Sequence, residues 1–268
     1  MTQSTLSLNK HNFSNDTEMM TLNGITHTFT QGTEQKTVLS NINLNLYENQ
    51  IVAIIGRSGT GKSTLLRIIA GLITPSLGNV HYCNVPMIGP VGDISMVFQS
   101  YALLPWLTVK ENVAFGLEAQ GMSPALRHKK AIEAIKMIGL EAEVENLPSA
   151  LSGGMKQRVG IARALVVEPE ILLMDEPFSS LDMFTATRLR DDIISLWDSN
   201  NLKTKSIVMV THNIDEAITM ADRIIVMSSN PGRIQSDISI DQSRPRNLND
   251  KALSALKAEI IEQLMHNE

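Results

Sequence analysis

The chain begins with alternating apolar positions and continues with short, unbroken apolar runs. Every second residue from Ile42 to Leu46 is apolar, which is the period of a half-buried strand, and Met20 to Phe29 shows a weaker alternation of the same kind. Ile51 to Ile55 is continuously apolar and ends at Gly56, as expected of a parallel strand covered on both faces. The pattern predicts a small β layer followed by a buried strand.

Helical periodicity follows this strand. Apolar positions between Lys62 and Leu72 mark one face of a helix. Farther along, Thr108 and Glu111 have the spacing of a capping box. Ser123-Pro124 has the pattern of an N-cap followed by a first-turn proline, and Ser152 is a further N-cap candidate. These signals predict an inserted helical lobe.

Strand and helix patterns alternate again after this lobe, which predicts a return to the parallel sheet. We expect strands at Ile171 to Asp175, Ser206 to Thr211 and Arg223 to Met227, helices starting near Asp182 and after Asn213, and a last helix striped by Leu253, Leu256, Ile260 and Leu264. Residues 1–18, rich in Ser, Asn and Thr, are predicted to be a flexible tail. One domain is expected at 19–245, with the helical lobe at about 99–165, and a C-terminal amphipathic helix at 246–268.

Composition narrows the class of protein. With 268 residues, 43% of them apolar, the chain can bury a large core, and its formal net charge of -5 gives no basic field to attract nucleic acid. Cys83 has no partner for an internal disulfide and no signal segment opens the chain, so the cytoplasm is the expected location. The longest apolar runs are far shorter than the roughly 20 residues of a membrane helix.

The strand that ends at Gly56 leads into a phosphate-loop pattern. The pattern G-x-x-x-x-G-K-[ST] is matched by Gly56, Arg57, Ser58, Gly59, Thr60, Gly61, Lys62 and Ser63, and Thr64 follows directly. Glycines let backbone N–H groups turn toward phosphate oxygens, and the next helix presents its positive end. Lys62 is expected to reach the β- and γ-phosphates of a nucleotide and the Ser63 hydroxyl to hold Mg²⁺. The ordinary alternative is a Gly/Ser turn before a helix.

Two carboxylates follow the apolar run that begins at Ile171. Asp175 stands at the carboxyl end of a predicted buried strand, where ligands bind in open α/β sheets, and is expected to reach Mg²⁺ directly or through water. Glu176 is then placed to be the general base that accepts a proton from the attacking water. A solvated turn before Pro177 is the bland alternative.

Between these two halves of a nucleotide site lies a third motif, Leu151 to Arg158. It puts Ser152, Gly153 and Gly154 at the start of a helix, which makes a second amide-rich anion site. An ordinary glycine-containing N-cap would give the same pattern. A chain folded around its own phosphate loop has little obvious need for a second such site.

In this order the three motifs resemble those of the ATP-binding subunit of an ABC transporter. The resemblance implies an α/β fold: a P-loop NTPase core with a parallel sheet, an N-terminal antiparallel β layer and an inserted helical lobe. It also implies that two subunits pair head to tail, so that Ser152, Gly153 and Gly154 close over the γ-phosphate held by the partner's loop. The chain has Met155 where many members of the family carry glutamine.

Three further positions, Gln99, Asp182 and His212, match the family residue by residue, and Phe29 occupies the place of a family aromatic. The resemblance implies that Gln99 touches Mg²⁺ or water and relays the nucleotide state, and that Asp182 lies in a loop crossing the dimer interface. It makes His212 the switch histidine that contacts the γ-phosphate, and Phe29 the aromatic that stacks on adenine. Taken alone, they would be a structural glutamine, a helix cap, a surface histidine and a core aromatic.

Residues 98–109, 151–155 and 228–234 look like those of importers of the nitrate, sulfonate and taurine group. That resemblance implies a homodimer on the cytoplasmic face of a membrane, bound to transmembrane permease subunits and served by a separate substrate-binding protein. The transported substrate would not contact this chain, so the sequence does not identify that substrate. The alternatives are an ABC exporter or lipid-trafficking ATPase, and a soluble ABC ATPase acting on DNA ends or ribosomes. A GTP switch would need an N-K-x-D motif, which is missing.

The loop from Tyr101 to Leu107 is unusually apolar for a connection that should face water. We predict that it forms the floor of a groove that receives a permease helix, with Gln99 linking it to the nucleotide. The alternative is that Trp106 fills the core of the helical lobe itself.

Overall fold

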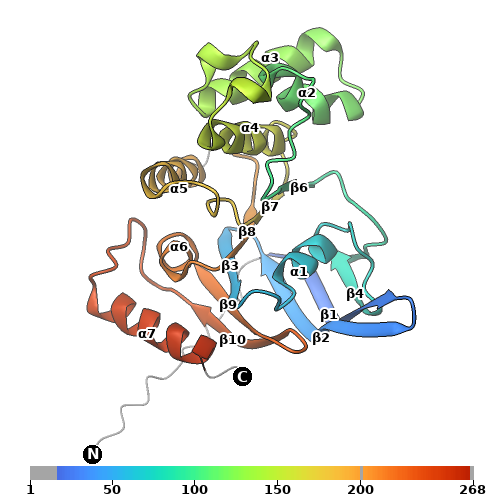
Figure 1. The fold of residues 1–268 in the computed structure, drawn as a ribbon, viewed down its shortest axis with the longest axis vertical. Coiled ribbons are helices and arrows are strands. Elements are labelled where there is room, and N and C mark those ends of the chain that lie inside the picture. The colour runs from blue at the N-terminus through green and yellow to red at the C-terminus, as the bar shows by residue number, and fades with distance from the viewer. Residues whose placement is uncertain (1–16, 200–201, 266–268) are drawn as a thin grey trace, which may run out of the picture. The chain divides into compact units, whose positions relative to one another are not determined.

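The computed structural model describes residues 17–199 and 202–265 (Figure 1). The described residues form two compact units, one of residues 17–65, 75–87 and 212–265 and one of residues 66–74 and 88–199 with 202–211. Most of the predicted flexible tail, residues 1–16, lies outside the described residues, and Glu18 already belongs to the first strand.

An antiparallel sheet in the first unit has the strand order β2-β1-β4-β5. Its strands are β1 (Glu18–Gln31), β2 (Glu34–Tyr47), β4 (Leu77–Tyr82) and β5 (Val85–Pro86). Alternate side chains of β2, including Ile42 and Leu46, are fully buried, as the sequence pattern predicted. Strands β4 and β5 were not predicted, because Leu77–Tyr82 buries only Val80 and Tyr82 and shows no clear alternation.

The first unit also contains three strands of a second sheet. β3 (Gln50–Gly56) pairs in parallel with β9 (Arg223–Ser228), and β10 (Arg233–Ser239) pairs antiparallel with β9. β3 is buried along its whole length, which explains its unbroken apolar sequence. Helices α6 (Ile214–Met220) and α7 (Lys251–Met265) of this unit (Figure 1) contact each other. Helix α7 buries Leu253 and Ile260.

The turn between β9 and β10 lies against the loop that follows β3. The N–H of Gly232 donates to the carbonyl of Val38 at 2.8 Å, and its own carbonyl accepts from the N–H of Ser40 at 2.9 Å. A Cβ atom at Gly232 would lie 2.1 Å from the carbonyl oxygen of Thr60, far inside van der Waals contact. Only a residue without a side chain fits at this position.

In the second unit, three parallel strands lie in the order β8-β7-β6. They are β6 (Ile94–Val97), β7 (Ile171–Asp175) and β8 (Ser206–Thr211), and helix α5 (Met183–Asp198) follows β7. β7 and β8 are buried at every position. Helix α1 (Lys62–Ile69) runs from the first unit into the second and ends earlier than expected, because Gly71 turns the chain at φ 72°.

The helical lobe of the second unit has a core of its own. It contains α2 (Val109–Ala119), α3 (Pro124–Met137), α4 (Gly153–Leu165) and the 3-10 turns η1 (Glu141–Glu143) and η2 (Pro148–Ala150). Buried residues from all three helices, such as Val113, Ile135 and Val159, form one apolar cluster. The capping box of Thr108 and Glu111 is present, whereas the Ser123 side chain makes no capping hydrogen bond.

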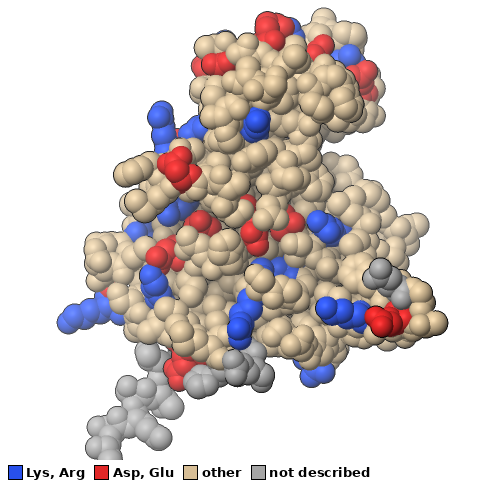
Figure 2. All heavy atoms as spheres, in the orientation of Figure 1, with Lys and Arg blue, Asp and Glu red and all other residues tan. Residues whose placement is uncertain are grey.

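Charged side chains of both signs are interspersed on the face drawn in Figure 2, without a continuous basic patch. Within residues 17–199 and 202–265, none of the helices is long and apolar enough to span a bilayer.

Candidate functional site

The loop between β3 and α1 adopts a conformation that depends on its glycines. Gly59 and Gly61 have φ angles of 82° and 88°, in the left-handed region that side chains disfavour. A Cβ atom at Gly61 would lie 2.7 Å from the side chain of Leu39. The Lys62 side chain is 7% exposed and its Nζ donates to the carbonyls of Gly56 at 2.8 Å and Arg57 at 2.9 Å. The ammonium is therefore held over the loop, as a phosphate cradle requires.

The carboxyl end of β7 carries the predicted acidic pair in the second unit. Asp175 is 3% exposed, and Glu176 follows at φ 46°, with its N–H donating to the carbonyl of Val210 at 2.9 Å. Nε2 of Gln99 donates to Oε2 of Glu176 at 3.1 Å. A left-handed, non-glycine residue is strained, and such residues cluster at functional sites. The fold thus brings Gln99 to Glu176 although they are far apart in sequence.

The segment after Gln99 is held by an arginine that sequence analysis did not identify. Tyr101 and Ala102 have φ angles of 62° and 48°. Nη2 of Arg163, in α4, donates to the carbonyl of Tyr101 at 2.8 Å, and Nη1 donates to that of Ala102. Burial lowers the pKa of Arg163 from its ordinary value. The Tyr101 hydroxyl also lies 2.8 Å from the Ser180 hydroxyl, so the segment is tied to both α4 and the loop before α5.

Trp106 is 71% exposed, so it does not fill the core of the helical lobe. Asn112 of α2 holds the backbone around Trp106. This asparagine is fully buried, and sequence analysis did not identify it either. Its side chain bonds to Leu104, Leu107 and Thr108. No sequence pattern distinguishes this asparagine from a surface one.

Ser152 caps helix α4, accepting a hydrogen bond from the N–H of Met155 at 3.3 Å. A Cβ atom at Gly154 would lie 2.5 Å from Cγ2 of Thr185 in α5, so this glycine permits close helix packing. Met155 packs against the apolar core of the lobe, so its side chain has an apolar, structural contact where a glutamine would offer a polar group.

Asp182 caps α5 through Oδ1, which accepts from the N–H groups of Phe184 and Thr185, each at 3.1 Å. Hydrogen bonds from the Thr185 side chain and backbone lower the pKa of Asp182, so it is ionised at neutral pH. The cap that its sequence position alone suggested is present. A role at a dimer interface stays a prediction.

Phe29 and His212 lie in the first unit, as the phosphate loop does. The Phe29 ring is 46% exposed and meets the His27 ring edge to face, with centroids 4.6 Å apart. His212 is exposed and directly follows β8. Gln99, the acidic pair, Ser152, Gly153, Gly154 and Asp182 lie in the second unit. The predicted site residues are thus divided between the two units.

The residues suit a nucleotide with its magnesium ion. No three His, Cys, Asp or Glu side chains of the described part of the chain gather as a metal cluster. Mg²⁺ commonly takes one or two protein carboxylates together with phosphate oxygens and water. Asp175, which is buried, and the hydroxyl of Ser63 are each oxygen donors of this kind, the first in the second unit and the other in the first. A Cβ atom at Gly59 would have no neighbouring heavy atom within 4 Å, so the loop is open at this glycine.

Comparison with known proteins identifies similar chains. A family model described as ABC transporter matches residues 39–179. The nitrate import ATP-binding protein NrtD of Synechocystis is 45% identical over 78% of this chain and 79% of its own length. The aliphatic sulfonates import ATP-binding protein SsuB of Escherichia coli K12 is 42% identical over 85% of each chain.

A solved structure is similar over most of the fold. It is described as the dimeric structure of a post-hydrolysis state of an ATP-binding cassette bound to ADP and Pi. It superposes with a TM-score of 0.74 at 36% identity and covers 84% of this chain and 100% of its own.

Proposed function

The chain belongs to the ABC transporter family and is one of its ATP-hydrolysing cassettes, and from this premise we propose that it powers an importer of small anions. Two relatives above 40% identity are named for the import of nitrate and of aliphatic sulfonates, which are both small anions. The cassette would lie on the cytoplasmic face of the membrane, bound to a separate permease. A separate binding protein would select the cargo.

In the proposed site, Lys62 and the loop amides bind the β- and γ-phosphates of ATP. The remaining loop residues, Arg57, Ser58, Gly59, Thr60 and Thr64, line the same phosphates. Phe29 stacks on adenine through its exposed face. Ser63, Gln99 and Asp175 would hold Mg²⁺, which supplies charge neutralisation at the phosphates.

Glu176 is the proposed general base. It accepts a proton from water as the water oxygen attacks the γ-phosphorus and the bond to the bridging oxygen breaks, releasing ADP and phosphate. The observation that carries this assignment is the Gln99–Glu176 hydrogen bond directly beside buried Asp175. His212 contacts the γ-phosphate in this proposal and stabilises charge there.

Glu176→Gln tests the base assignment. The amide keeps the shape and the contact with Gln99 but cannot take a proton, so kcat is expected to fall by about 10²-fold or more. The dissociation constant for ATP should stay within about threefold, because binding rests on Lys62 and the loop amides. Turnover, equilibrium binding of ATP, and anion uptake by vesicles that contain the permease would be measured.

Lys62→Ala is the matched control, because it should lose ATP binding as well as turnover. Wild-type turnover by purified Glu176→Gln protein would show that another group is the base. Loss of ATP binding by Glu176→Gln would assign the residue to binding instead.

The loop from Tyr101 to Leu107 is the proposed permease-docking surface. An exposed tryptophan on a loop that is fixed by Arg163 and Asn112 is a preorganised anchor for a partner helix. When Gln99 engages the nucleotide site, the attached loop would shift and move the permease helix with it.

Trp106→Ala should weaken assembly with the permease by about thirtyfold or more, since truncation of an aromatic anchor typically costs about 2 kcal/mol or more. Melting temperature and ATP binding should stay near wild type. Phe115→Ala is a matched control, because Phe115 is 50% exposed on α2 but lies outside this loop. Assembly by Trp106→Ala at wild-type affinity would place the docking surface elsewhere.

A further inference from the structure

Helix α6 begins shortly after His212, the residue proposed to contact the γ-phosphate. His212 directly precedes Asn213, the N-cap, whose Oδ1 accepts from the N–H groups of Asp215 at 2.9 Å and Glu216 at 3.3 Å. His212 is thereby joined to the first turn of α6 through the cap. A shift of that first turn must move the histidine backbone.

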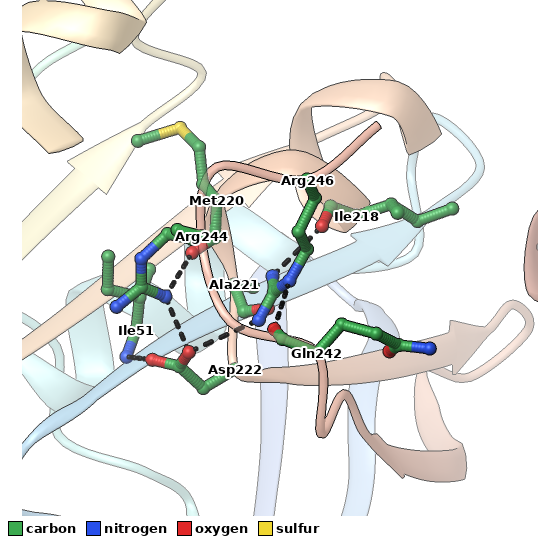
Figure 3. Close-up of polar contacts among 8 residues, drawn as sticks. All are labelled: Ile51, Ile218, Met220, Ala221, Asp222, Gln242, Arg244 and Arg246. Atoms are coloured by element: carbon green, nitrogen blue, oxygen red, sulfur yellow. Dashed lines mark hydrogen bonds and ion pairs between the residues drawn. The ribbon is translucent and has the colours of Figure 1, made fainter. Parts of the chain in front are cut away.

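The C-terminal end of α6 is held firmly. Nη1 of Arg246, whose side chain is 1% exposed, donates to the carbonyl of Ile218 at 3.0 Å and to that of Ala221 (Figure 3). Nη1 of Arg244 donates to the carbonyl of Met220 at 2.9 Å. Cations at the carbonyl end of a helix satisfy its orphan acceptors and complement its dipole.

The same cluster ties this end of α6 to the strand that precedes the phosphate loop. Oδ1 of Asp222 accepts from Arg244 and lies 3.4 Å from Nη2 of Arg246. Its Oδ2 accepts from the N–H of Ile51, in β3, at 2.9 Å (Figure 3). The C-terminal end of α6 therefore has a fixed reference in the sheet.

The N-terminal end of α6 is held differently. Nζ of Lys257, in α7, lies 2.6 Å from Oδ1 of Asp215 and donates to its Oδ2 at 2.8 Å. Both side chains are 39% exposed. An open surface hollow of about 340 Å³ lies beside the pair, lined by His212, Asn213, Ile214, Asp215 and Lys257. The ion pair therefore lies on the solvent-facing side of the first turn of α6 and links that turn to α7.

We infer that Lys257 is a positioning residue for His212 and that α7 thereby sets the rate of ATP hydrolysis. The inference rests on the proposed role of His212. With its C-terminal end fixed, α6 can pivot only by moving its first turn, and the ion pair with Asp215 limits that movement. Loosening the pair spreads His212 over more positions, which weakens a contact needed in the transition state. ATP binding by the phosphate loop is unaffected.

Lys257→Glu tests the inference, because it replaces attraction with repulsion at a half-exposed site. We expect kcat to fall about three- to fivefold, the upper part of the range for a partly exposed ion pair acting on a barrier. The dissociation constant for ATP and the melting temperature should stay near wild type. Lys257→Arg should keep at least half of kcat, since a cation of similar reach remains. Lys257→Gln is the milder replacement should the charge reversal impair folding.

Lys251→Glu is the matched control. It makes the same charge change on α7 at an exposed lysine and should leave kcat unchanged. Lys257→Glu at wild-type kcat, or with a loss equal to that of Lys251→Glu, would overturn the inference.

A double-mutant cycle with His212→Ala separates the inference from the proposed function. If Lys257 acts through His212, Lys257→Glu should have little further effect on the single-turnover rate of the His212→Ala protein. An equal fold loss in both backgrounds would show that Lys257 acts elsewhere. A wild-type rate for His212→Ala alone would instead overturn the proposed role of the histidine, and the inference with it.

Discussion

Asn112 shows how much one buried amide can determine. Its Nδ2 donates to the carbonyls of Leu104 at 3.1 Å, Leu107 at 2.9 Å and Thr108 at 3.0 Å, and its Oδ1 accepts from the N–H of Leu104 at 2.8 Å. One side chain therefore replaces the hydrogen bonds that a short helix or strand would give to this loop. The fixed loop presents Trp106 outward.

Asn112→Leu removes these hydrogen bonds with little change in volume. Unpaired backbone groups are expected to lower the free energy of unfolding by about 1–3 kcal/mol. The loop should also become mobile enough to weaken permease assembly while ATP binding persists. Urea unfolding and an assembly assay would measure both effects.

Asn146→Leu, at an exposed asparagine of the same lobe, is the control and should change stability by less than about 0.5 kcal/mol. Equal stability of the Asn112→Leu and wild-type proteins would contradict the proposed role of the amide.

Single residues divide into those whose local sequence predicts their structure and those whose structure depends on distant partners. Thr108, Ser152 and Asp182 cap helices as predicted, because a cap involves only the next few residues. Asn112 and Arg163 have no comparable signal. Arg163 bonds to a backbone segment that only the folded chain brings beside α4.

At the scale of an element, α6 depends on side chains that arrive from a later part of the chain. Arg246→Met keeps most of the apolar volume but leaves the carbonyls of Ile218 and Ala221 without this donor. Breaking such a buried arrangement is expected to lower the free energy of unfolding by about 2–4 kcal/mol, measured by urea unfolding.

Arg233→Met is the control, since Arg233 is exposed on β10, and it should cost less than about 0.5 kcal/mol. A loss for Arg246→Met no larger than that of the control would mean that α6 holds its position without the arginine.

Elements with a strong apolar signal in the sequence were predicted well. β3, β7 and β8 were predicted from unbroken apolar runs, because burial on both faces favours apolar residues at every interior position of the strand. The weaker elements were not: β4 has Gly78 at φ 86° and three exposed positions, and α1 ends where Gly71 adopts a left-handed conformation. A Cβ atom at Gly71 would lie 2.4 Å from the carbonyl oxygen of Gly89, a contact between loops that local sequence cannot reveal.

At the scale of the whole molecule, the order of three motifs along the chain was enough to predict the family, and this prediction is confirmed. The predicted α/β fold is confirmed as well. The domain boundaries and the roles of the site residues stay predictions. Cargo identity could not follow from this chain, since in the proposed assembly no residue of the cassette contacts the transported anion.

The head-to-tail pairing of two copies that the family resemblance implies is a hypothesis with a quantitative test. One chain with Lys62→Ala and one with Ser152→Arg would be joined in tandem so that only mixed dimers form. One composite site then carries both defects and the other carries neither. With independent sites, ATP hydrolysis is expected at about half the wild-type rate, and each mutant homodimer should be near background. If the mixed dimer were as inactive as the homodimers, the arrangement or the independence of its sites would be wrong.

The tight fit of Gly232 under the carbonyl of Thr60 limits which sequences can descend from this one. A turn between two strands ordinarily tolerates substitution, and the exposed neighbour Arg233 has that freedom. Position 232 does not, because any residue other than glycine must displace either the turn or the phosphate loop that it contacts. A β-hairpin transplanted to this position from a distant homologue would therefore need a glycine at the position equivalent to 232. Without this glycine, we expect the protein to lose nucleotide binding while it still folds.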